Sequence, residues 1–73
     1  MKVVEIGMLG SYCRRNNLCT GMDLTQWNRL LAYAAERFNE PTYFRDLAVM
    51  IKFCSTTDKT FDDIEKDLKE MAL

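Results

Sequence analysis

The sequence contains no histidine among its 73 residues. Histidine is the commonest general base and metal ligand, and its ordinary pKa lies near neutral pH. The chain also lacks a glycine-rich phosphate-binding loop, since Gly7 and Gly10 form only a GxxG fragment. Ser11 and Ser55 have no histidine that could activate them as nucleophiles. We therefore expect a protein that is not an enzyme and that has no cofactor and no small-molecule substrate.

Neither sign of charge is in excess. Lysine and arginine number 10, aspartate and glutamate number 11, and the formal net charge is −1. Small domains that bind nucleic acid usually carry a clear positive excess, and the same excess attracts a protein to anionic membranes. The composition therefore predicts no general affinity for either surface.

Long apolar runs are also missing, although 48% of the residues are hydrophobic. No stretch approaches the roughly 20 apolar residues that a membrane-spanning helix needs. Lys2 and Glu5 interrupt the apolar segment that a secretion signal would require at the N-terminus. We therefore expect a protein of the cytoplasm.

Cysteine is limited to Cys13, Cys19 and Cys54, an odd number at irregular spacing. Small secreted domains usually carry an even, dense set, so free thiols in a reducing compartment are expected. A structural zinc site would need a fourth ligand such as Asp23, and no CxxC pair is present. We favour buried or incidental thiols over a metal site, and Cys19 has no evident partner for a redox role.

What the chain does contain is apolar residues that recur at intervals of three and four, which is the pattern of amphipathic helices. We predict an all-α fold, a compact four-helix domain with short connections that comprises residues 1–73. The predicted helices cover about residues 2–15, 23–38, 42–54 and 60–72.

Helix boundaries are marked by capping residues and by the single proline. Asp23 with Gln26, and Thr60 with Asp63, have the spacing of capping boxes at helix N-termini. Pro41 cannot lie in a helix interior, so it separates the second predicted helix from the third.

The first segment has a second interpretation. Val4, Ile6 and Met8 alternate with Glu5 and Gly7, as in a short strand. A single strand has nothing to pair with, and no other segment reads as a strand. We therefore prefer a helix, with the strand as the alternative.

Two predicted helices carry more apolar residues than one buried face requires. A 73-residue chain has a marginal core, and a shared interface would add to its stability. We therefore predict self-association or a protein partner, although a central helix can also touch neighbours on both sides. The predicted interface residues are Val4, Met8, Tyr12, Val49, Met50 and Phe53.

The charged helices suggest two further contacts. The last predicted helix is rich in aspartate and glutamate, which indicates either a solvated face or a second contact for a basic partner. On the second helix, Arg29, Tyr33 and Arg37 share one face, which could contact a nucleic acid, as in a small regulator, or an acidic partner. Cations that complement the helix dipole explain part of this pattern equally well.

Short strings at both ends of the chain carry a resemblance. They are Val-Glu-Ile-Gly at 4–7, Tyr-Cys-Arg-Arg-Asn-Asn at 12–17, Ile-Lys-Phe-Cys-Ser at 51–55 and Thr-Asp-Lys at 57–59, with Ile64. Together they resemble small uncharacterised proteins encoded in prophages and mobile elements of Gram-positive bacteria. The resemblance implies a helical accessory protein of the bacterial cytoplasm and supplies no catalytic residues. By analogy, such a protein inhibits or redirects a host or defence protein by covering part of its surface. A non-catalytic protein-interaction module is therefore the expected function.

Overall fold

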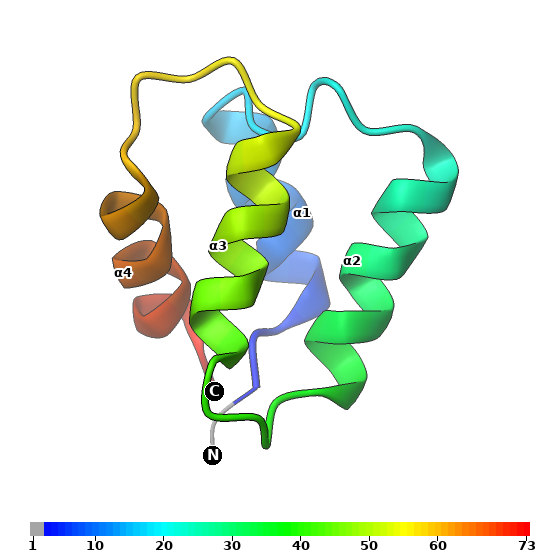
Figure 1. Cartoon of the computed structure of the whole chain (residues 1–73), viewed down its shortest axis with the longest axis vertical. Helices are drawn as coiled ribbons and strands as arrows, with labels where there is room; N and C mark the ends of the chain where they lie inside the picture. Colours follow the sequence, from blue (N-terminus) through cyan, green and yellow to red (C-terminus); the bar gives the residue numbers. More distant parts are fainter. Residues whose placement is uncertain (1–2) are drawn as a thin grey trace.

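The computed structural model describes residues 3–73 and contains four helices joined by short connections (Figure 1). These are α1 (Ile6–Arg15), α2 (Leu24–Glu36), α3 (Tyr43–Phe53) and α4 (Phe61–Met71). The prediction of a small all-α, four-helix domain is confirmed.

The four helices are arranged in a ring in which each packs against two others. The central helix of Figure 1, α3, packs against α4 on one side and α2 on the other, while α1 packs behind them against α2 and α4. Because α3 has neighbours on both sides, much of its apolar circumference is used within the domain. The buried core residues are Val4, Leu9, Tyr12, Cys13, Leu18, Leu30, Ala34, Tyr43, Leu47, Ala48, Ile51, Ile64 and Leu68.

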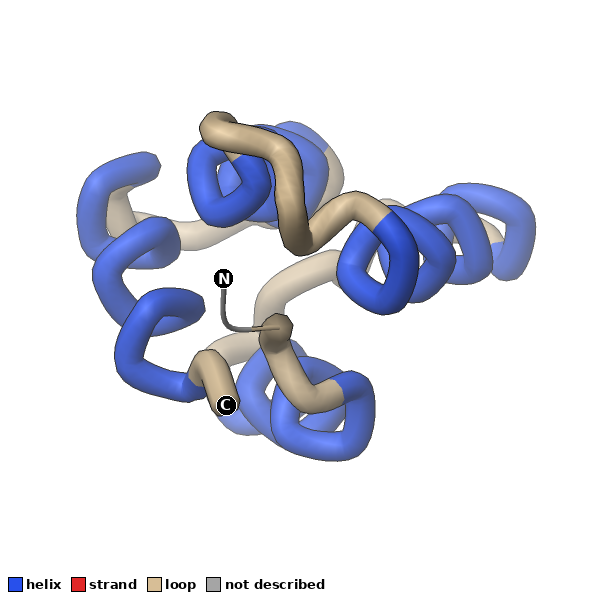
Figure 2. The backbone as a smooth tube through the Cα atoms, turned by 90° about the horizontal axis from the view of Figure 1, so that it is seen from below, coloured by secondary structure: helices blue, strands red, loops and turns tan. Residues whose placement is uncertain are grey.

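The first helix begins later than predicted, at Ile6, and Lys2, where the prediction started, lies outside the described residues. Val4 instead pairs with Ala72 in an isolated antiparallel bridge, and the Leu73 N–H donates to the carbonyl oxygen of Val3 at 2.9 Å. Figure 2 shows the C-terminal end beside the segment that precedes α1. The chain thus supplies a pairing partner for the extended start of the molecule. One bridge does not make a strand, and residues 3–73 contain none.

Both predicted capping boxes are present. The Gln26 N–H donates to Asp23 Oδ1 at 2.8 Å, and the Asp23 N–H donates to Gln26 Oε1 at 2.9 Å. Thr60 and Asp63 form the same reciprocal pair, at 3.1 and 3.3 Å. These bonds satisfy backbone donors that a helix N-terminus leaves unpaired, so α2 and α4 begin where the sequence predicts.

Tyr43 is the central residue of the core, and the sequence pattern did not identify it. The side chain is fully buried, stacks on Tyr33 with ring centroids 5.9 Å apart and meets the edge of Phe44 at 5.0 Å. Its hydroxyl donates to the Ala34 carbonyl oxygen at 2.6 Å and accepts from the Val4 N–H at 3.1 Å. One phenol thus connects the N-terminal segment, α2 and α3.

Candidate interaction surface

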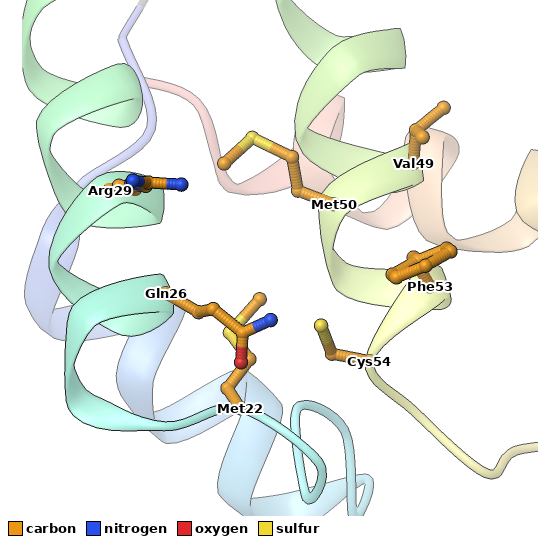
Figure 3. Close-up of a pocket in the computed structure, with 7 residues that line it drawn as sticks. All are labelled: Met22, Gln26, Arg29, Val49, Met50, Phe53 and Cys54. Carbon is orange, nitrogen blue, oxygen red and sulfur yellow. The ribbon is translucent and has the colours of Figure 1, made fainter.

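A hollow of about 260 Å³ opens between α2 and α3, and we call it the α2–α3 groove (Figure 3). Met50 and Cys54 on α3 and its C-cap point across the groove toward α2, while Val49 and Phe53 lie along its outer edge. The lining residues are Met22, Gln26, Arg29, Val49, Met50, Phe53 and Cys54. Most of this lining is apolar, which is the usual character of a surface that another molecule covers.

The edge of the groove on α3 is unusually exposed for apolar side chains. Phe53 is 85% exposed and Val49 is 48% exposed, and they lie one helical turn apart. The opposite face of the same helix is fixed in the core by Leu47 and Ile51, both fully buried. The helix therefore cannot rotate to hide Phe53 without exposing its core face, so the apolar edge is a consequence of the packing.

The α2 wall of the groove supplies the polar groups. Arg29 and Gln26 project from α2 toward Met50 and Met22 (Figure 3). Within residues 3–73, the guanidinium of Arg29 makes no ion pair with a carboxylate. The groove thus presents an apolar wall, an amide and one cation that no carboxylate among residues 3–73 neutralises.

The six predicted interface residues divide into three groups. Val49, Met50 and Phe53 lie together at the α2–α3 groove. Met8 is 41% exposed on α1 but does not line the groove. Val4 and Tyr12 form the third group, and their assignment to an exposed interface is wrong.

Val4 and Tyr12 are core residues, 1% and 5% exposed. Val4 is covered because the terminal bridge and the Tyr43 hydroxyl hold its backbone inside the domain. Tyr12 is covered because α1 turns that side of the helix toward α4, where the Tyr12 hydroxyl donates to Asp67 Oδ2 at 2.6 Å. The apolar stripe that suggested a partner for α1 is therefore satisfied largely within the domain.

Asp67 joins Tyr12 and Lys59 in a polar cluster at the edge of the core. Lys59 Nζ lies 3.0 Å from the same carboxylate oxygen that accepts the Tyr12 hydrogen bond. Burial, together with the neighbouring Asp67, raises the pKa of Tyr12. The hydrogen bond from Tyr12 and then the ammonium of Lys59 lower the pKa of Asp67. At least one acidic residue of α4 therefore stabilises the fold instead of facing a partner.

One of the two arginines on the predicted basic face of α2 is paired with a carboxylate of this chain. Arg37 Nη1 lies 2.9 Å from Glu40 Oε1. The Tyr33 hydroxyl lies 2.8 Å from Asp46 Oδ2 and 3.2 Å from Glu40 Oε2. Within residues 3–73, Arg29 makes no ion pair. It lines the α2–α3 groove and also a second hollow, which it shares with Tyr33 and Arg37.

The thiols are arranged differently from the prediction. Cys13 and Cys19 lie together with their sulfur atoms 3.5 Å apart, whereas Cys54 lines the α2–α3 groove. All three are free. Across residues 3–73, no three cysteine, aspartate or glutamate side chains gather closely enough to hold a metal ion. The six-residue spacing gave no signal of the Cys13–Cys19 pair because a loop, and not a helix turn, brings them together.

No protein-family model matches the chain, and neither the curated proteins nor the solved structures contain a significantly similar one. In the described part of the chain, each helix is too short or too polar to cross a bilayer.

Proposed function

We propose that the chain is a non-catalytic protein-interaction module that receives an amphipathic helix of another protein in the α2–α3 groove. The observation that carries the proposal is the 85% exposure of Phe53 beside Val49, at the edge of an apolar hollow. Contiguous exposed apolar side chains on a small domain usually mark a site of association. Two side-by-side helices with a hollow between them form the surface on which helix-in-groove recognition is built.

The charge at the groove favours a particular kind of helix. Arg29 offers an unpaired cation beside the apolar side chains of Met50 and Met22. A partner helix with an apolar stripe and a carboxylate one turn away would bury the stripe and pair the carboxylate with Arg29. We therefore propose an acidic, amphipathic helix as the bound element.

A second copy of the chain is a weaker candidate for the occupant. The acidic helix α4 has the right charge, but its apolar residues Ile64 and Leu68 are fully buried against the core. Another copy would have to detach α4 from its own core before inserting it. A different protein with an accessible helix can bind without losing core contacts of its own.

The resemblance of residues 12–17 and 51–55 to mobile-element proteins supports a biological setting for this module. We propose that the partner is a host or defence protein of a bacterial cytoplasm. By occupying an interaction helix of that partner, the module would block or redirect its normal contacts. This setting is a separate proposal from the groove itself, and the same experiment identifies the partner.

Photo-crosslinking in the native host tests the proposal. A benzoylphenylalanine replaces Phe53 in one variant and Asp62, an exposed residue of α4, in the control variant. We expect one partner protein to be captured from position 53 and not from position 62, through a segment with an amphipathic helical sequence and acidic residues. Excess unlabelled wild-type chain should abolish the adduct, whereas excess Phe53→Glu chain should not.

Two outcomes would overturn the proposal. Equal capture from positions 53 and 62 would mean that the groove has no special role. Capture of this chain alone from position 53 would mean that the groove joins copies of the same protein.

A further inference from the structure

Cys13 and Cys19, one on a helix and the other in the loop that follows it, form a close pair of thiols in the fold. Cys13 lies in the last turn of α1 and is 3% exposed, and Cys19 lies half-buried in the connection between α1 and α2. The Cys19 thiol donates a hydrogen bond to the Cys13 sulfur, with the two sulfur atoms 3.5 Å apart. This contact is independent of the α2–α3 groove and of the proposed function.

The connection holds Cys19 in a backbone conformation that side chains seldom adopt. Its φ angle is +63°, in the left-handed region, which is sterically unfavourable for a non-glycine residue. Ser55 stabilises this conformation, because its Oγ accepts the Cys19 N–H at 2.7 Å. Leu18, buried next to it, donates its N–H to the Cys13 carbonyl oxygen at 2.8 Å. Contacts on both sides of the loop therefore maintain a strained residue in the place that brings the sulfurs together.

The hydrogen bond between the sulfurs also shifts the pKa values of both thiols. It lowers the pKa of the Cys13 thiol, because the Cys19 S–H stabilises a thiolate on Cys13, and it raises the pKa of Cys19. Once the pair has lost one proton, the Cys19 S–H stabilises the thiolate on Cys13. A thiolate beside a thiol is the arrangement that dithiol redox pairs use.

We propose that Cys13 and Cys19 are a redox-active dithiol that peroxide converts to an intramolecular disulfide. The thiolate of the pair attacks one peroxide oxygen, so that an S–O bond forms, the O–O bond breaks and hydroxide leaves. The second thiol gives its proton to this hydroxide, which becomes water, and the resulting thiolate attacks the sulfenic sulfur. An S–S bond forms, the S–O bond breaks, and the leaving hydroxide takes up the proton that the pair lost when its first thiolate formed. Overall, two thiols and one hydrogen peroxide give one disulfide and two water molecules, with the sulfurs oxidised and the peroxide reduced. A thiol reductant restores the pair.

Mass spectrometry of the folded chain tests this reaction. One molar equivalent of hydrogen peroxide should remove the mass of two hydrogen atoms from the wild type and leave one alkylatable thiol. Trypsin cleaves after Arg14 and Arg15, between the two cysteines. The oxidised chain should therefore yield peptides 3–14 and 16–29 joined by a disulfide, which reduction separates.

Cys54 provides the matched control. The Cys54→Ser variant keeps the pair, and it should form the same disulfide at the wild-type rate. The Cys19→Ser variant should form no intramolecular disulfide and should accumulate a sulfenic acid that dimedone traps. Because the wild type and Cys54→Ser carry the decisive result, the test stands even if a variant of buried Cys13 does not fold.

The proposal also predicts a role for the folded loop. The same treatment in concentrated urea should form the Cys13–Cys19 bond more slowly than in the native protein, because the fold no longer aligns the sulfurs. Three results would overturn the inference: three free thiols after peroxide treatment of the native chain, addition of oxygen to the cysteines without a disulfide, or disulfides that link Cys54 or two chains instead.

Discussion

The hydroxyl of Tyr43 donates a hydrogen bond to the carbonyl oxygen of Ala34 at 2.6 Å, within a core where both residues are fully buried. The same oxygen accepts the backbone N–H of Val4. The bond connects the start of α3 with the last turn of α2, in the halves of these helices that do not line the α2–α3 groove. The packing of α3 against α2 therefore includes a buried polar contact as well as apolar contacts.

Replacing Tyr43 by Phe should destabilise the domain by about 1–3 kcal/mol, because it leaves the Val4 N–H and the Ala34 carbonyl buried without a partner. Urea unfolding followed by circular dichroism measures the change. Tyr33→Phe is the matched control, since its hydroxyl lies at the half-buried edge and meets carboxylates that water can solvate. A Tyr43→Phe variant no less stable than Tyr33→Phe contradicts this account of the core.

Stability should depend on pH through Asp67. Its pKa in the folded state is lowered by the Tyr12 hydroxyl and then by Lys59, so the ionised carboxylate stabilises the fold above the pKa of an unfolded aspartate, about 4. This contribution is lost as the pH falls through the lower folded pKa. Asp67→Asn should therefore be less stable than the wild type at pH 7, and the gap should narrow as the pH falls below about 4. Urea midpoints measured across this range check the prediction, and a gap that is constant with pH contradicts it.

Mutations at the edge of the α2–α3 groove and mutations in the core should have different effects on the free energy of unfolding. Phe53→Ser should change the free energy of unfolding by no more than about 0.5 kcal/mol, because the side chain is 85% exposed. Leu47→Ala, on the inner face of the same helix, should cost about 2–5 kcal/mol. Thermal and urea unfolding of the two variants provide the measurement. A large loss of stability in Phe53→Ser would mean that Phe53 stabilises the isolated domain, and it would contradict a role for this side chain in binding a partner.

The face that contains Tyr33 and Arg37 should not bind nucleic acid. Glu40 and Asp46 lie within hydrogen-bond distance of these side chains and repel phosphate. A gel-shift series that begins at low salt should show no complex with double- or single-stranded DNA. A salt-dependent complex that Arg37→Gln weakens would contradict this prediction and favour the alternative function, a nucleic-acid-binding regulator.

Features governed by local sequence were predictable. The capping pair Asp23 and Gln26 marks a helix start through contacts three residues apart, and the structure places it there. Val49 and Phe53, which the sequence predicts at an interface, are exposed because Leu47 and Ile51 on the other side of α3 are buried.

Features governed by contacts between distant residues were not predictable. The sequence predicts Tyr12 at an interface with a partner, but α4 brings Asp67 to its hydroxyl from 55 residues away. The Cys13–Cys19 pair depends on a left-handed residue held by Ser55, and no spacing rule reveals such a turn. In both cases the sequence pattern does not show which helix or loop packs against the residue.

The most direct test of the central claim is a two-dimensional amide NMR titration of the folded chain with a synthetic peptide. The peptide carries the partner segment that crosslinks to position 53. The α2–α3 groove hypothesis predicts that the largest shifts fall on Met22, Arg29, Met50 and Phe53, and that Arg29→Gln and Phe53→Ser weaken binding. Shifts that concentrate on α1 or α4, or binding that neither substitution weakens, would contradict it.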